Sequence, residues 1–70
     1  MKTYTVHVYD NLDILQDRWG EFDNRRAAES AAAKHLEDAQ LGGWYALIIE
    51  QRNIASVVLP AVRAVVTPIK

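Results

Sequence analysis

An alanine-rich segment in the middle of the chain constrains the fold most strongly. Six of the thirteen residues from Ala27 to Ala39 are alanine, the residue with the highest helix propensity. Asp23 or Asn24 suits the N-cap of this helix, and Gly42-Gly43 suits its end. Small side chains let such a helix lie close against a β-sheet. The residues expected to face inward are Ala28, Ala32, His35, Leu36 and Ala39.

Strand-forming residues lie on both sides of this segment. Thr3 to Tyr9 alternate, with Tyr4, Val6 and Val8 on one face, which predicts a strand with one buried side. Trp44 to Glu50 shows little alternation, which predicts a central strand buried on both faces.

The end of the chain continues this apolar pattern. Gln51-Arg52-Asn53 is expected to form a tight connection to a further strand from Ile54 to Leu59, which Pro60 ends or bends. Residues 61–69 then form either another strand or a short helix that begins at Pro60.

The segment from Leu12 to Phe22 allows two interpretations. Leu12, Leu15 and Trp19 have the spacing of a short helix that ends at Gly20. The same segment also suits a loop followed by a short strand from Arg18 to Phe22, paired with the first strand. We favour the hairpin.

These elements predict an α+β fold, a two-layer sandwich of one helix on a three- or four-stranded sheet in β(β)αββ order. Seventy residues are expected to form a single domain, residues 1–70, near the lower size limit for one apolar core. The chain has no cysteine, no apolar run long enough to cross a membrane and no leader-like N-terminus, so we expect a cytoplasmic protein.

The sequence contains no convincing catalytic, cofactor or metal motif. His7 is predicted on the outer face of the first strand and His35 on the inner face of the helix, and no third ligand has a suitable spacing. The adjacent carboxylates Glu37 and Asp38 diverge on a helix. We therefore expect no enzyme activity, no cofactor and no metal.

Charged residues on either side of the helix start suggest contact with a partner. Arg25 and Arg26 stand in the first helical turn, where cations oppose the helix dipole, and would suit an acidic partner or a phosphate. The preceding segment is acidic, and its carboxylates would suit a basic surface. The candidate binding residues in that segment are Asp13, Asp17 and Glu21, together with Trp19, which suits either an interface anchor or the core.

The apolar C-terminal segment predicts self-association. Ten of the thirteen residues from Ile54 to Val66 are apolar, and one helix can cover only one face of the sheet. Some of these side chains should remain exposed and form a patch typical of an interaction site. The candidate homodimer residues are Val57, Val58, Val62 and Val65.

In size, near-neutral charge, arrangement of elements and lack of a catalytic motif, the chain resembles small phage and mobile-element proteins that include anti-CRISPR proteins. That resemblance implies an inhibitor that occludes a surface of a host complex. A local pattern, Gly20-Glu21-Phe22 followed by Arg26-Ala27-Ala28 and Lys34-His35-Leu36, is similar to half of a peptidoglycan-binding SPOR repeat, but the chain lacks the second helix of that fold.

The leading hypothesis is thus a non-catalytic domain that binds a host protein or protein complex. The alternative is a helix-on-sheet module that binds nucleic acid, with Arg25, Arg26 and Lys34 meeting phosphates and aromatic rings stacking on bases. The net charge of −1 argues against nucleic acid.

Overall fold

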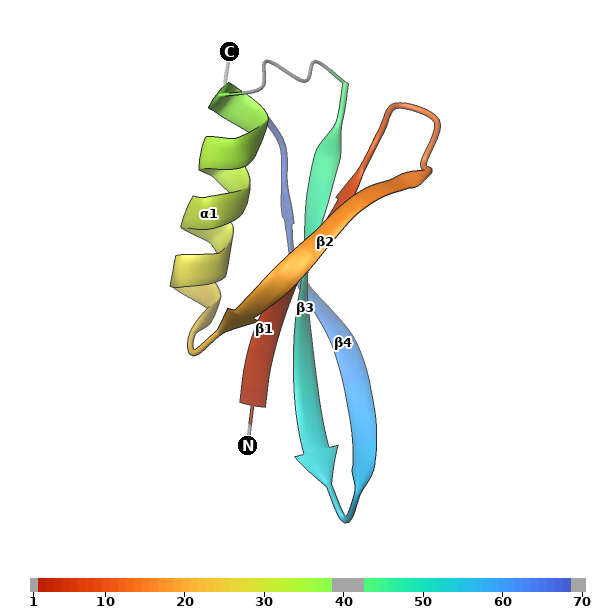
Figure 1. Ribbon diagram of the computed structural model, residues 1–70, viewed down its shortest axis with the longest axis vertical. Coiled ribbons are helices and arrows are strands. Elements are labelled where there is room, and N and C mark those ends of the chain that lie inside the picture. The colour runs from red at the N-terminus through yellow and green to blue at the C-terminus, as the bar shows by residue number, and fades with distance from the viewer. Residues whose placement is uncertain (1, 39–42, 69–70) are drawn as a thin grey trace.

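The computed structural model describes residues 2–38 and 43–68, without the side chains of residues 53 and 54. It contains one helix packed on a four-stranded antiparallel sheet of order β2-β1-β3-β4 (Figure 1), which confirms the predicted α+β arrangement. The elements in chain order are β1 (Lys2–Tyr9), β2 (Leu15–Phe22), α1 (Arg25–Asp38), β3 (Tyr45–Ile54) and β4 (Val57–Val66).

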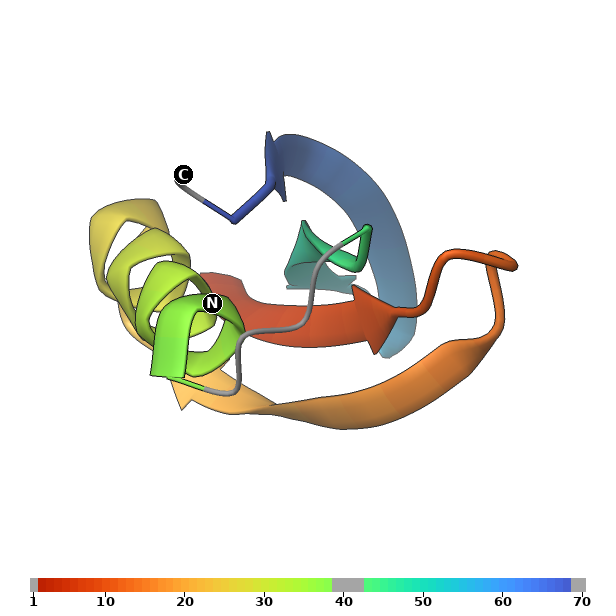
Figure 2. The ribbon, with the colours of Figure 1, turned by 90° about the horizontal axis from the view of Figure 1, so that it is seen from above.

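The core lies between α1 and one face of the sheet (Figure 2). The two central strands contribute β-branched and small residues, and the helix contributes mainly alanine, so the two layers approach closely. Seven fully buried residues form this core: Val6, Val8, Ala28, Ala32, Leu36, Ala46 and Ile48. The predicted burial of Val6, Val8, Ala28, Ala32 and Leu36 is confirmed. His35 is only half-buried, and Ala39 lies outside the described residues.

Local interactions fix the start of α1 and stabilise its exposed side. The side-chain oxygen of Asn24 accepts a hydrogen bond from the backbone N–H of Ala27 at 2.8 Å, so Asn24 rather than Asp23 is the cap. Two i,i+4 ion pairs form on the exposed side of the helix, Arg25 with Glu29 at 3.0 Å and Lys34 with Asp38 at 3.1 Å.

The segment before the helix is a strand, as favoured from the sequence. It begins at Leu15, three residues earlier than predicted, and pairs antiparallel with β1. Gly20, a possible helix stop in the alternative interpretation, lies opposite Thr5 within this ladder. A Cβ at Gly20 would lie only 2.8 Å from Thr5 Cγ2 and 3.0 Å from Thr5 Cα, which explains the glycine.

The predicted connection at residues 51–53 is wrong, and so is the break at Pro60. β3 continues to Ile54, and the turn is formed by Ala55 and Ser56, which have φ angles of 51° and 68°. β4 then runs without interruption through Pro60 to Val66, so residues 61–66 belong to the same strand and form neither a separate strand nor a helix.

Pro60 is tolerated because β4 is an edge strand. In a hairpin with a two-residue turn, Ile54 and Val57 form a hydrogen-bonded pair, and such pairs recur at every second position. Pro60 pairs with Gln51 at one of the intervening positions, where the residue's N–H would point away from β3. No ladder hydrogen bond is lost there.

The β3–β4 hairpin extends beyond the helix (Figure 1). Its ten-residue strands measure about 33 Å, whereas the fourteen residues of α1 measure about 21 Å. The strands of the hairpin are therefore longer than the helix. The helix leaves the end of the hairpin uncovered on both faces.

Candidate functional site

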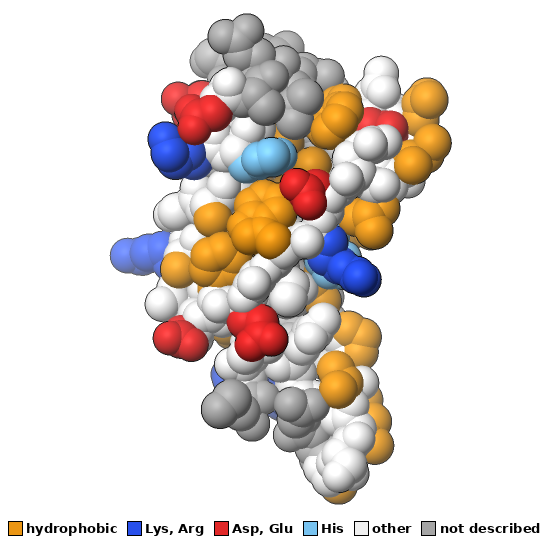
Figure 3. Space-filling view, in the orientation of Figure 1, with side chains coloured by type: hydrophobic (Ala, Val, Ile, Leu, Met, Phe, Trp, Pro, Cys, Tyr) orange, Lys and Arg blue, Asp and Glu red, His pale blue; other side chains and the backbone are white. Residues whose placement is uncertain are grey.

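β4 carries a row of exposed apolar side chains. Along this side of the molecule hydrophobic side chains are visible from the β1–β2 loop down to the hairpin (Figure 3). On β4 itself, five apolar side chains have relative exposures between 49% and 61%. They are Val57, Val58, Leu59, Val62 and Val65. The four valines predicted for an oligomer interface are therefore all exposed, and Leu59 was missed because Pro60 was expected to end the strand there.

Strand register assigns these side chains to two faces. Ile48 pairs with Ala64 and belongs to the core beneath α1, whereas the adjacent pairs, Leu47 with Val65 and Ile49 with Val62, point the other way. We call this second side, which is turned away from α1, the open face. By the same alternation, Val58 lies on the open face, and Val57 and Leu59 lie on the helix side, where the hairpin extends past the helix.

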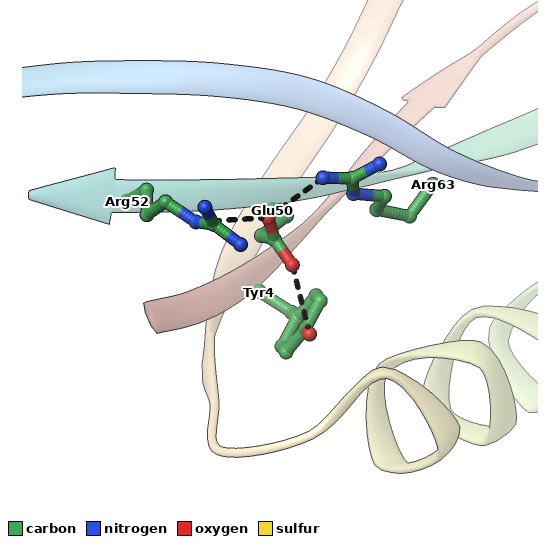
Figure 4. A network of polar contacts seen from close by, with 4 residues as sticks. All are labelled: Tyr4, Glu50, Arg52 and Arg63. Atoms are coloured by element: carbon green, nitrogen blue, oxygen red, sulfur yellow. Dashed lines mark hydrogen bonds and ion pairs between the residues drawn. The ribbon is translucent and has the colours of Figure 1, made fainter. Parts of the chain in front are cut away.

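A polar network fixes β4 to the rest of the sheet (Figure 4). Glu50 is 5% exposed, and its Oε1 accepts a hydrogen bond from Arg63 Nη2 at 3.1 Å. Its other oxygen accepts a hydrogen bond from the Tyr4 hydroxyl, also at 3.1 Å, and Arg52 lies 3.6 Å from Oε1. The network thus joins side chains from β1, β3 and β4.

The charges in this network favour an ionised Glu50. The hydrogen bond from Arg63 is the main cause that lowers the pKa of Glu50, and the same carboxylate raises the pKa of Tyr4. Arg63 is the extra residue at a β-bulge between the Ile48 and Ile49 pairs. Sequence reasoning missed Glu50 and Arg63 as a pair. The sequence signal that could have revealed this pair is Glu50 itself, a carboxylate two residues beyond Ile48 and therefore on the same face of an otherwise apolar strand.

The two candidate arginines at the start of α1 are both exposed. Arg25 is engaged with Glu29, whereas Arg26 has no ion pair with any residue that the structure describes. The helix start therefore presents one paired and one available guanidinium to solvent.

The candidate acids do not form one cluster. Asp17 and Glu21 are four residues apart on β2, about 13 Å along the strand. Asp13 lies in the β1–β2 loop with a φ of 63° and accepts a hydrogen bond from the Tyr45 hydroxyl at 2.6 Å. This bond is the main cause that raises the pKa of Tyr45 to about 12.

Asp10 organises the loop that contains Asp13. Its Oδ1 accepts hydrogen bonds from the backbone N–H groups of Leu12 and Ile14 at 2.8 and 3.0 Å, and its Oδ2 accepts one from Gln16 at 2.7 Å. The hydrogen bonds from the backbone lower the pKa of Asp10. Asp10 therefore stabilises the conformation of the β1–β2 loop.

Trp19 is half-buried at the margin of the core. Its ring lies 5.1 Å from the ring of His35, centroid to centroid, and it packs against the buried cluster between β2 and α1. This placement matches the core role that the sequence left open. As an anchor for a partner, Trp19 could offer only the part of its ring that stays exposed.

The other histidine, His7, lies on the open face, as predicted. Its ring nitrogen is 3.2 Å from the Thr5 hydroxyl, and its neighbour across the ladder is Arg18. Partial burial, followed by the charge of Arg18, lowers the pKa of His7. His7 and His35 thus lie on opposite sides of the sheet.

The surface offers little that could enclose a small molecule. A hollow lined by residues 15–18 is open to solvent. Among residues 2–38 and 43–68, no three side chains of the metal-binding types come together. Within these same ranges, the structure has no helix of the length and hydrophobicity needed to cross a membrane.

The fold and its surfaces are the basis for any functional assignment. The chain matches no protein-family model, no curated protein and no solved structure.

Proposed function

We propose that this chain is a non-catalytic domain that binds another protein chain. The observation that supports this function best is the row of five exposed apolar side chains on the edge strand β4. Solvent-exposed apolar patches of this kind are typical of interaction sites on small proteins. They all lie on a single edge strand, on both of its faces, and are not scattered residues.

The extent of the surface supports the same function. The solvent-accessible surface is 4876 Å², compared with about 4400 Å² for a compact monomer of 7.9 kDa. The radius of gyration is 12.2 Å, compared with about 11 Å for a compact domain of this length. The projecting hairpin contributes to this excess and gives a partner more surface to contact.

We further propose that the domain acts as a cytoplasmic inhibitor of the phage type, similar to anti-CRISPR proteins, that occludes a surface of a host complex. In this proposal Arg26 on α1 and the carboxylates of Asp17 and Glu21 on the opposite edge strand β2 supply charge complementarity at a second contact, apart from the apolar strand. The support for the inhibitor class is the resemblance in size, layout and lack of catalytic motif described above.

One observation favours nucleic acid as a second candidate. Tyr9 and Tyr45 stack on the open face with ring centroids 5.4 Å apart, and His7 and Arg18 lie farther along the same face. Aromatic rings beside a cation are typical of single-strand binding surfaces. The hydrogen bond from Tyr45 to Asp13 places a carboxylate at this pair, which opposes phosphate, so we rank this function second.

The test is affinity capture from bacterial lysate with the tagged chain, with and without nuclease treatment, followed by mass spectrometry. A stoichiometric protein that survives nuclease supports binding through the hairpin if it is lost with Val57→Lys/Leu59→Lys, on the helix side, or with Val62→Lys/Val65→Lys, on the open face. The double variant Glu37→Lys/Asp38→Lys on the far end of α1 serves as the matched control, since both sites are exposed.

Two results would overturn the proposal. Retention of the same partner by both hairpin variants would exclude the apolar strand as the binding surface. Loss of all captured proteins on nuclease treatment would instead favour the nucleic-acid function, and retardation of single-stranded oligonucleotides that weakens steeply with salt would establish it.

A further inference from the structure

We infer that a second copy of this chain packs face to face on the open face of the β3–β4 hairpin and forms a homodimer. This inference rests on the proposed protein-binding function and names its first partner. The side chains that would make the contact come from two neighbouring strands and are Leu47, Val58, Pro60, Val62 and Val65.

The chemistry of β4 argues against the other way of dimerising, in which two edge strands pair through their backbones. At the position of Pro60, the backbone N–H of any other residue would point outward, away from β3. Proline has no N–H, so the middle of the outer edge lacks a hydrogen-bond donor. The bulge at Arg63 further interrupts the regular spacing of backbone groups. Proline and bulges are devices by which edge strands avoid pairing with other strands. The exposed side chains remain available to a partner that approaches the face.

The composition of the open face favours an identical partner. The described residues that β3 and β4 contribute to it include no carboxylate, ammonium or guanidinium group. Homodimer interfaces are more apolar than interfaces between proteins that also exist apart, whose composition resembles the ordinary surface. Two copies of this face would cover each other without burying an unpaired charge.

The dimensions of the hairpin set the expected strength of the dimer. Two ten-residue strands span about 33 by 10 Å, on the order of 330 Å² for each partner. The total of about 660 Å² is smaller than a typical stable interface and corresponds to a weak, transient one. We therefore expect a reversible dimer with a dissociation constant in the high micromolar range.

Sedimentation velocity of the purified chain from 1 to 500 μM tests this inference. We expect a concentration-dependent shift from monomer to dimer, and at least tenfold weaker dimerisation for Val62→Lys and for Val65→Lys. Val57→Lys is the matched control, because this valine has a similar exposure on the same strand but lies on the opposite face. It should leave the dimer unchanged. Circular dichroism spectra and thermal unfolding confirm that each variant is folded.

A second measurement keeps the inference testable if a lysine variant fails to fold. Val62→Thr preserves the shape and the strand preference of valine while it removes apolar contact, and should weaken the dimer several-fold. Since the chain has no cysteine, Val62→Cys also introduces a unique thiol. A short bifunctional maleimide should then link two copies at micromolar concentration, and Val57→Cys should not.

Three results would overturn the inference in distinguishable ways. A monomer at 500 μM together with a heterologous protein captured through the hairpin would exclude the dimer and leave the proposed function intact. A monomer that captures no protein would exclude both. A dimer that is lost with Val57→Lys but not with Val62→Lys would show association through the opposite face.

Discussion

Replacement of Leu36 by alanine tests the packing of the two layers most directly. The three buried residues of α1 are Ala28, Ala32 and Leu36, so Leu36 is the one large apolar side chain that the described helix places in the core. It is fully buried among Val6, Val8 and Ile48. The variant removes this side chain and leaves a cavity against the sheet.

The expected loss is large relative to the stability of so small a domain. Truncation of a buried leucine to alanine costs about 2–5 kcal/mol. A domain of seventy residues has a free energy of unfolding of about 3.5–10 kcal/mol. The variant should therefore lose about half of its stability, and its melting temperature should fall by about 8 °C or more, since about 1 kcal/mol corresponds to a shift of 4–8 °C.

Urea unfolding followed by circular dichroism, at equal protein concentration for each variant, measures this loss. Glu37→Ala is the control, because Glu37 is exposed on the next helical position and its replacement should change the stability by less than about 0.5 kcal/mol. A loss below about 1 kcal/mol for Leu36→Ala would refute the packing described here. It would mean that α1 turns a different face to the sheet.

Three further predictions concern single interactions. Asn24→Ala should cost about 0.5–2 kcal/mol in urea unfolding because it removes the helix cap, whereas Asp23→Ala should cost little. The lowered pKa of Glu50 stabilises the fold above its ordinary pKa of 4.5, and this contribution disappears as the pH falls through the folded-state value. Between pH 6 and 3 the melting temperature should thus fall less for Glu50→Gln than for the native chain. In an NMR titration His7 should show a pKa below 6.5, and Arg18→Ala should raise it; an unchanged value would exclude the influence of Arg18.

The sequence predicts the fold well where one physical signal dominates. β1 is recognised by strict alternation of β-branched residues, α1 by its alanine content and cap, and β3 by an apolar run typical of a central strand. The expected burial of β3 on both faces is not met at Leu47, which stays half-buried on the open face. Each of these signals depends on neighbours in the chain. The two layers follow because one apolar helix stripe and the apolar faces of the strands must cover each other.

The β3–β4 turn shows where such signals fail. Ala55-Ser56 adopts positive φ angles that usually require glycine or asparagine. Neither residue is typical of such a turn, so the turn cannot be recognised from the sequence. The polar residues 51–53 resemble a turn more closely, yet they continue β3. Pro60 resembles a strand breaker, and only its place on an outer edge, away from the ladder hydrogen bonds, makes it acceptable.

The candidate surfaces were predictable in the same uneven way. Exposure of Val62 and Val65 follows from counting layers, since one helix cannot cover two faces. The Glu50–Arg63 contact depends on a register set by the turn and shifted by the bulge, and neither of these is visible in the residues themselves. The loop contacts of Asp13 depend in the same way on a distant strand, through Tyr45.

The alanine-rich helix and the exposed strand have a common physical cause. Half of the residues are apolar, but a helix that contributes mainly alanine encloses little volume, so the buried cluster contains only seven residues. The remaining apolar side chains must lie elsewhere, and the chain places five of them on one strand. The Glu50 network ties that strand to β1 and β3, so its side chains are held in place before a partner arrives, and less conformational freedom is lost on binding. The features that limit the stability of this fold are thus the same ones that leave the exposed strand to which we assign the binding of a partner.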